Sequence, residues 1–131
     1  MSSRAPIGYL AIAEVPVAIN QGFIALVPEG RLSTVFIWQW VIANMEAILQ
    51  KANGSTFQEI SKGNFRPLPV VVPSGPLLKR FDEIVGPLYE RIRDNEIETH
   101  SLVGLRDLLL PKLMSGEIHL KDAEKKIEEA L

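Results

Sequence analysis

The sequence predicts an α+β fold, in which a small mixed sheet carries a packed helix and is followed by a long coiled-coil-like helix. Two observations support this prediction. Short apolar runs separated by turn residues fill roughly the first 30 residues, a pattern typical of strands that are buried on both faces. After Pro76, apolar residues recur every three or four positions, as they do in a helix that packs along one side.

The predicted sheet is built from short runs of apolar residues that are bounded by turn formers. Pro28-Glu29-Gly30 closes the first group of runs as a turn, and the segment 65–73 is extended because each of its prolines disfavours the helical region for the preceding residue. The candidate strands cover residues 9–13, 15–19, 22–27 and 56–60.

A helix over residues 34–52 is expected to pack on this sheet. Ser33 is a favourable N-cap, and apolar residues follow at helical spacing. Asn53-Gly54 ends the helix, because glycine tolerates the left-handed conformation of many helix stops. Trp38 and Trp40 lie two positions apart, so they point to different sides of the helix. We interpret them as core residues; the alternative is stacking on nucleic-acid bases.

The second half predicts one long helix. Pro76 suits a first helical turn, and Gly86-Pro87 is expected to kink or split the helix, since an interior proline costs about 3 kcal/mol. A helix of roughly 50 Å, at 1.5 Å per residue, has too few partners within so short a chain. We therefore expect it to pack on another subunit or on a missing domain. Beyond its end near Ser115-Gly116, residues 118–120 are a strand candidate and Asp122 a cap for a last helix.

Composition narrows the function classes. The 131 residues contain no cysteine, which excludes disulfides and thiolate metal sites and is compatible with the cytoplasm. No secretory signal is visible, and no apolar stretch reaches the roughly 20 residues that span a bilayer. The net charge of −2 argues against strong nonspecific nucleic-acid binding. Residues 1–75 carry five basic and four acidic side chains, so only this part would tolerate a phosphate surface.

Several motifs resemble a known family. The helix and its tail carry the pattern Leu102-Val103-Gly104-Leu105-Arg106-Asp107, three leucines and then Pro111-Lys112-Leu113-Met114-Ser115-Gly116-Glu117-Ile118. This pattern strongly resembles the conserved helix of the specificity subunits of type I restriction-modification systems. Further resemblances, in the family's order, lie at residues 4–8, 18–23, 54–56, 65–70, 81–88 and 95–98, so they cover nearly the whole chain.

The resemblance implies a non-catalytic role without a cofactor. Such subunits join target-recognition domains, which read the halves of a split DNA site, to helices that set their spacing and dock methyltransferase subunits. Methylation, translocation and cleavage belong to the methyltransferase and restriction subunits. Residues 1–75 would then be a partial recognition domain and residues 76–131 a helical spacer, dimerisation and docking region. Because the resemblance starts midway through a recognition domain, we expect a C-terminal part, truncated naturally or by engineering.

Six polar residues of the first part are candidates for DNA contact. Arginine, asparagine and glutamine can make paired hydrogen bonds to base edges, whereas lysine and serine serve phosphates. The alternative is that each is an ordinary solvated loop residue. The candidates are Arg4, Gln21, Ser55, Lys62, Asn64 and Arg66.

The long helix supplies the candidate interface. Its apolar residues form a seam without an obvious partner inside the chain, so we expect a homodimer in which two such helices pair antiparallel. Arg106 and Asp107 are either docking residues or a surface pair worth under about 1 kcal/mol. The interface candidates are Leu88, Ile92, Leu102, Leu105, Arg106, Leu109 and Leu113.

Three functional hypotheses remain open. The first is sequence-specific DNA recognition within a restriction-modification complex. The second is an interaction-only protein that dimerises or docks the methyltransferase without reading DNA. The third is an unrelated enzyme, which is disfavoured because no phosphate-binding loop, nucleophile motif or cofactor motif is present. Glu96, Glu98, His100 and Asp107 are better interpreted as a solvated helix face than as a metal site.

Overall fold

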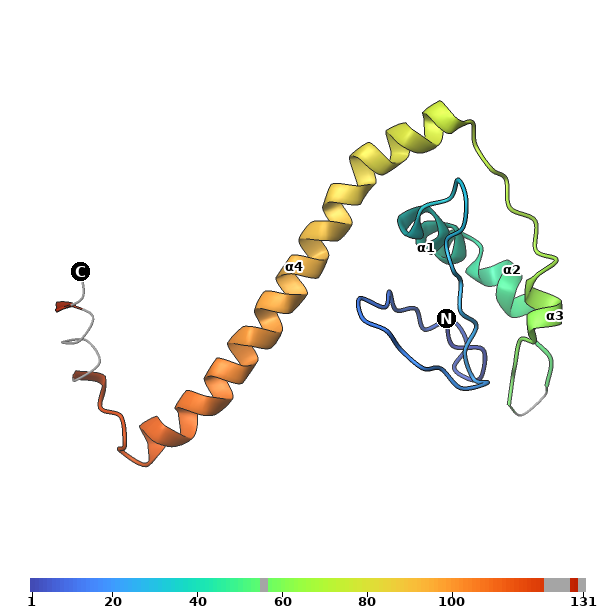
Figure 1. Cartoon of the computed structure of the whole chain (residues 1–131). Helices are drawn as coiled ribbons and strands as arrows, with labels where there is room; N and C mark the ends of the chain where they lie inside the picture. Colours follow the sequence, from blue (N-terminus) through green and yellow to red (C-terminus); the bar gives the residue numbers. More distant parts are fainter. Residues whose placement is uncertain (55–56, 122–127, 130–131) are drawn as a thin grey trace. The chain divides into compact units, whose positions relative to one another are not determined.

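The computed structural model describes residues 1–54, 57–121 and 128–129, and these are mainly helical (Figure 1). Two compact units divide the chain, Met1–Pro87 and Leu88–Leu131. The first contains three short helices, and a long helix runs from the first unit into the second. The helices are α1 (Thr34–Ala43), α2 (Met45–Gln50), α3 (Lys62–Phe65) and α4 (Gly75–Met114).

The predicted mixed sheet is wrong. Within residues 1–54, 57–121 and 128–129, β pairing consists of three isolated antiparallel bridges, Ser2–Phe23, Arg4–Glu59 and Asn53–Glu59. An apolar run becomes a strand only when another extended segment lies beside it along its length. Residues 9–13 and 15–19 have no such segment, and residues 118–120 form a bend and the start of a helical turn.

Residues 1–5 supply the pairing that does occur. Their backbone lies between residues 21–24 on one side and residues 58–60 on the other. Ser3 N–H donates to the Gly22 carbonyl at 2.8 Å, and the Ser3 carbonyl accepts from Ile60 N–H at 2.9 Å. The Met1 amino group donates to the Ile24 carbonyl at 3.1 Å, and partial burial lowers the pKa of this amino group. The buried Ser3 thus has its backbone groups satisfied from two distant segments.

The core of the first unit is small and gathers side chains from each of these segments. Its buried members come from the segment after residue 21, from α1 and α2, and from the region of α3. Trp40 packs on its edge and meets Phe65 edge-to-face, with ring centroids 6.3 Å apart. The fully or nearly fully buried members are Ile24, Val41, Ile48, Ile60 and Phe65.

The predicted helix over residues 34–52 forms as two helices rather than one. Ser33 caps α1 as predicted, because its hydroxyl oxygen accepts from Phe36 N–H at 3.1 Å. Asn44 ends α1, and its side-chain amide donates to the Trp40 carbonyl at 2.8 Å. A side chain that bonds to its own helix backbone competes with the helical pattern, which accounts for the break.

Gly86-Pro87 was expected to kink or split the long helix, and it does not split it: α4 is continuous through Pro87 (Figure 1). Pro76 lies in the first turn as predicted, and Gly86 and Pro87 both remain helical. At 1.5 Å per residue its 40 residues span about 60 Å. No helix in the described part of the chain is both long and apolar enough to cross a membrane.

The first turns of α4 are fastened to α1 within the first unit. Ser33, besides capping α1, donates its hydroxyl hydrogen to Asp82 Oδ1 at 2.5 Å. Phe36 and Phe81 meet edge-to-face, with ring centroids 5.7 Å apart and planes at 81°. Leu78, one helical turn before Asp82, is buried. One serine therefore serves two helices that are far apart in the sequence.

Ser33→Ala is expected to lower the free energy of unfolding by about 1–2 kcal/mol, because it removes both the cap and the bond to Asp82. Urea denaturation of the single variants Ser33→Ala and Asp82→Ala and of the double variant would measure the coupling. Thr34→Ala, at the exposed neighbouring position, is the control. Strictly additive effects of the two substitutions would contradict the interaction.

Candidate functional site

Arg4 and Gln21 lie in the region where residues 2–4 pair with the turn at residues 20–22. Arg4 Nε forms an ion pair with Glu59 Oε1 at 3.3 Å, and both side chains are about half exposed. Asn20 Oδ1 accepts from Gly22 N–H at 2.8 Å, which fixes the turn and leaves the Gln21 side chain exposed at its tip. Glu59 therefore offsets part of the positive charge that Arg4 could present to a phosphate.

Gly8 explains one feature of the Arg-Ala-Pro-Ile-Gly motif. Its backbone φ of 99° is one that residues with a side chain rarely adopt. A Cβ atom added at Gly8 would lie 2.7 Å from Met45 Sδ. The backbone of this loop must therefore approach α2 closely. Arg4 is therefore positioned both by this close approach of its loop to α2 and by the backbone β-bridge between Arg4 and Glu59.

The second group of candidates belongs to α3. Ser61 caps this short helix, and its hydroxyl oxygen accepts from Asn64 N–H at 3.1 Å. The Asn64 side-chain amide donates to the Lys51 carbonyl at 3.1 Å, which ties α3 to the end of α2. Asn64 thus has a structural partner. Lys62 and Arg66 are both exposed, and they lie one helical turn apart.

Lys62 and Arg66 are among the residues that line a mostly apolar cavity of about 340 Å³ in the first unit. Sequence reasoning missed this cavity, because the segment after residue 65 was expected to be extended. The sequence signal that could have indicated this arrangement is the four-residue spacing of Lys62 and Arg66, because this spacing places both side chains on one face if the segment is helical. The other lining residues are apolar: Ile24, Ala25, Leu26, Val27, Leu32, Phe36, Ile37, Trp40, Phe65, Leu68 and Val70.

Ser55 lies outside the described residues.

The two tryptophans of α1 differ in their packing, as expected for residues on different sides of a helix: Trp40 packs on the core, and Trp38 is half-buried. Within residues 1–54, 57–121 and 128–129, no three histidine or acidic side chains are placed to hold a metal ion. The five described DNA candidates thus separate into Arg4 with Gln21, the pair Lys62 and Arg66, and Asn64, which fastens α3.

Helix α4 carries the interface candidates in the second unit. Leu88, Ile92 and Leu102 are each more than half exposed, at 58%, 53% and 57%. Leu105 and Leu113 are also exposed, and Leu109 is half-buried. Exposed leucines and isoleucines in a single row are unusual unless another surface covers them.

Arg106 pairs with its neighbour Asp107, with Nη2 2.7 Å from Oδ1 and both side chains mostly exposed. Solvent screens such a pair, so it adds little stability. Because this ion pair is solvent-exposed and joins neighbouring residues, it does not test the docking role of Arg106, which stays a prediction.

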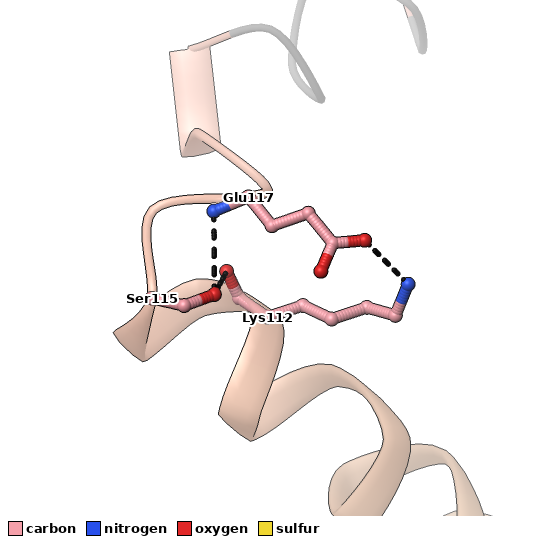
Figure 2. Close-up of polar contacts among 3 residues, drawn as sticks. All are labelled: Lys112, Ser115 and Glu117. Carbon is pink, nitrogen blue, oxygen red and sulfur yellow. Dashed lines mark hydrogen bonds and ion pairs between the residues drawn. The ribbon is translucent and has the colours of Figure 1, made fainter.

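The end of α4 gives the signature Pro-Lys-Leu-Met-Ser-Gly-Glu-Ile a structural meaning, as Figure 2 shows. Lys112 Nζ lies 2.7 Å from Glu117 Oε1, Ser115 Oγ donates to the Lys112 carbonyl at 3.2 Å, and Glu117 N–H donates to Ser115 Oγ at 3.4 Å. Gly116 has a φ of 74° and donates to the Leu113 carbonyl at 3.3 Å, as in many glycine helix stops. The signature thus ends the helix at a fixed residue.

Comparison with known proteins identifies the family. The family model described as "Type I restriction modification DNA specificity domain" matches residues 1–97, which include the whole first unit and the first part of α4 in the second. The chain belongs to this family. Membership confirms the resemblance that the sequence motifs indicated. No solved structure gives a significant match.

Two relatives show how much of a specificity subunit this family member covers. The Type I restriction enzyme HindI specificity subunit of Haemophilus influenzae is 26% identical over 121 residues, which are 90% of this chain and 26% of the relative. The Type I restriction enzyme MjaIX specificity subunit of Methanocaldococcus jannaschii is 30% identical over 78 residues, which are 60% of this chain and 18% of the relative. The chain thus spans about a quarter or less of the relatives it matches.

Asn64→Ala is expected to lower the free energy of unfolding by about 1 kcal/mol, because it removes the bond between α3 and the Lys51 carbonyl. Lys62→Ala, at an exposed position of the same helix, is the matched control and should change stability by less than about 0.5 kcal/mol. Thermal unfolding of the purified variants provides the comparison. Equal effects at the two positions would mean that the Asn64 bond does not stabilise the first unit.

Proposed function

We propose that this chain is a non-catalytic DNA sequence-recognition element of a type I restriction-modification complex, where it positions methyltransferase subunits on duplex DNA. The family match over residues 1–97 carries the proposal, because the family's description names DNA specificity. Both relatives are named as specificity subunits of restriction enzymes. The proposed location is the cytoplasm, since the chain would act on cellular DNA together with methyltransferase and restriction subunits.

The arrangement around α3 supports a phosphate contact. Lys62 and Arg66 present two positive charges from one helical turn, and the described residues offer them no carboxylate partner. Cationic side chains fix the register of a protein on DNA, whereas base edges supply the sequence information. Arg4 and Gln21 are the proposed base-reading residues, because both can make paired hydrogen bonds to purines. Ser55 remains a proposed phosphate contact.

Helix α4 supports a role in assembly. Its exposed apolar row is long, and its hydrogen-bonded stop at Gly116 defines where the row ends. We propose that the row pairs antiparallel with the same row of a second copy, so that the chain is a homodimer. A methyltransferase subunit would then dock on the helix pair.

An interaction-only role is the second candidate. The partial neutralisation of Arg4 by Glu59 and the structural bond of Asn64 favour it, because they remove two of the described candidates from the free cationic surface. In this case the chain would dimerise and dock without reading DNA. Binding to duplex DNA distinguishes the two roles.

DNA affinity should fall steeply as salt increases, because each phosphate contact releases a counterion. The variant Lys62→Ala/Arg66→Ala is expected to reduce the slope of log K against log salt by about 2, since the slope changes by roughly 0.9 per phosphate contact. Fluorescence anisotropy with a pool of random duplexes would measure it.

The control for this experiment is Lys79→Ala/Arg80→Ala, which removes two exposed cations from the first turns of α4 and should leave the slope unchanged. Equal losses in both variants would contradict a defined phosphate contact at α3. Failure of the wild type to bind any duplex would favour the interaction-only role.

The solution mass should correspond to a dimer that depends on the apolar row. Leu102→Asp/Leu109→Asp is expected to give a folded monomer, because burying two carboxylates in the pair is strongly unfavourable. Ile97→Asp is the control, since Ile97 is exposed and lies about 120–140° from Leu102 and Leu109 at 100° per residue. Light scattering with circular dichroism distinguishes the states. A monomeric wild type would overturn the dimer.

A further inference from the structure

The interior of the cavity in the first unit has no part in the proposed function. Its volume of about 340 Å³ falls within the range of roughly 300–1,000 Å³ that is typical of small-molecule sites. Lys62 and Arg66 are the charged residues among those that line it, and the other described lining residues are aliphatic or aromatic. Phe36, Trp40 and Phe65 contribute aromatic rings to the wall. This lining suits an apolar molecule that carries one charged group.

The walls of the cavity are held in place by contacts among the lining residues and with their neighbours. Trp40 and Phe65 meet edge-to-face, with ring centroids 6.3 Å apart. Phe36 meets Phe81 in the same way, with ring centroids 5.7 Å apart. The Asn64 side chain ties α3, which carries Lys62 and Phe65, to the end of α2. Because fixed walls need little further ordering, less conformational entropy opposes the binding of a ligand.

Lys62 and Arg66 supply positive charge to this apolar site. Both residues line the cavity and are exposed, so their aliphatic stems can cover apolar surface while their charged ends stay in water. Neither forms an ion pair within residues 1–54, 57–121 and 128–129. Glu59, the nearest acidic residue in the sequence, pairs with Arg4 instead. One anionic group of a ligand could therefore meet two cations that lie one helical turn apart.

The chemistry of the lining distinguishes between classes of ligand. A nucleobase or a sugar carries several polar groups, and each costs free energy when it is buried without a hydrogen-bond partner. A neutral hydrocarbon would make no use of the two cations. A docked peptide helix needs a groove that accepts anchors three, four and seven residues apart, whereas this site is one cavity near the lower limit of small-molecule sites. A small amphipathic anion meets both the apolar walls and the charge.

We propose that the cavity binds a small amphipathic carboxylate. Its hydrocarbon part contacts the aromatic and aliphatic walls, and its carboxylate lies at Lys62 and Arg66. This ligand site goes beyond the proposed function. One consequence rests on that function: because the same two cations are the proposed phosphate contact, an occupied cavity weakens the binding of DNA. The first unit would then be a recognition element whose DNA affinity responds to an amphipathic anion.

Tryptophan fluorescence tests the ligand site, because Trp40 lines the cavity. The chain has two tryptophans, so the substitution Trp38→Phe leaves Trp40 as the single reporter. Decanoate should change its emission saturably. Decanol, which has the same chain without the charge, should bind about 5-fold more weakly, as expected for the loss of two solvent-exposed charge contacts. Equal affinities would contradict the contact with the carboxylate, and no saturable binding of decanoate by fluorescence or calorimetry would overturn the site.

Substitutions separate the charged part of the site from the apolar part. Lys62→Gln/Arg66→Gln retains much of the aliphatic stems, so it should raise the Kd of decanoate about 5-fold and leave that of decanol unchanged. Ala25→Phe and Val70→Phe each add a ring at an exposed lining position and should weaken both ligands. Ala18→Phe, at an exposed position outside the described lining, is the matched control. Equal effects of all three phenylalanine substitutions in folded variants would overturn the assignment to this cavity.

The competition with DNA is measured separately at low salt. Saturating decanoate should raise the Kd of the wild type for a pool of random duplexes about 5-fold, because the ligand neutralises the phosphate contact. The variant Lys62→Gln/Arg66→Gln should show no such effect. Saturable decanoate binding without a change in DNA affinity would overturn the competition and leave the ligand site standing.

Two further outcomes keep the proposals distinguishable. A wild type that binds no duplex would overturn the proposed DNA role and the competition with it, while the fluorescence titration still decides the ligand site. An acidic, leucine-containing tetrapeptide serves as a protein-like probe. Tighter binding of this peptide than of decanoate would assign the cavity to a protein partner and overturn the small-molecule site.

Discussion

Backbone pairing by residues 1–5 is the constraint on which the first unit depends. This short segment lies between residues 21–24 and residues 58–60, and both neighbours use it to satisfy their own backbone groups. Ser3 is buried at the centre, where an unpaired N–H or carbonyl would cost about 1–3 kcal/mol. The pairing brings Ile24 and Ile60 to the same core. It also places Arg4 beside Glu59, so the electrostatics of that candidate site follow from the fold.

Helix α4 is governed by a different constraint, since it is far longer than the core that could cover it. Its first turns are covered: Leu78 is buried, and Phe81 meets Phe36. Beyond Pro87 the apolar row is exposed, and the side-chain hydrogen bonds of Thr99, Ser101 and Lys112 are local to the helix and its stop. Stability of the helix there must come from its backbone bonds or from a partner, and tertiary packing is normally the larger source.

Local signals were predictable from the sequence, and long-range pairing was not. The Ser33 cap and Pro76 in the first turn of α4 depend on residues within one turn, and both predictions are confirmed. The strands were wrong because an apolar run does not reveal whether an extended partner lies beside it. The hydrogen bond from Ser33 to Asp82 joins residues 49 positions apart in the sequence, and no sequence pattern predicts it. The DNA candidates were named by residue type, which cannot reveal that Lys51 engages Asn64.

The same serine that caps α1 also links the two proposed activities. Lys62 and Arg66 lie around a cavity that includes Phe36 and Trp40 of α1, and Ser33 and Phe36 hold the first turns of α4. In the proposed function, the surface around Lys62 and Arg66 would keep a fixed position relative to the first turns of α4 only if the contacts between them resist bending. A charge-assisted hydrogen bond and an aromatic edge contact, side by side, provide such a connection. In the proposed role, these contacts would hold the first turns of α4, and the hydrogen-bonded stop at Gly116 would set where the helix ends.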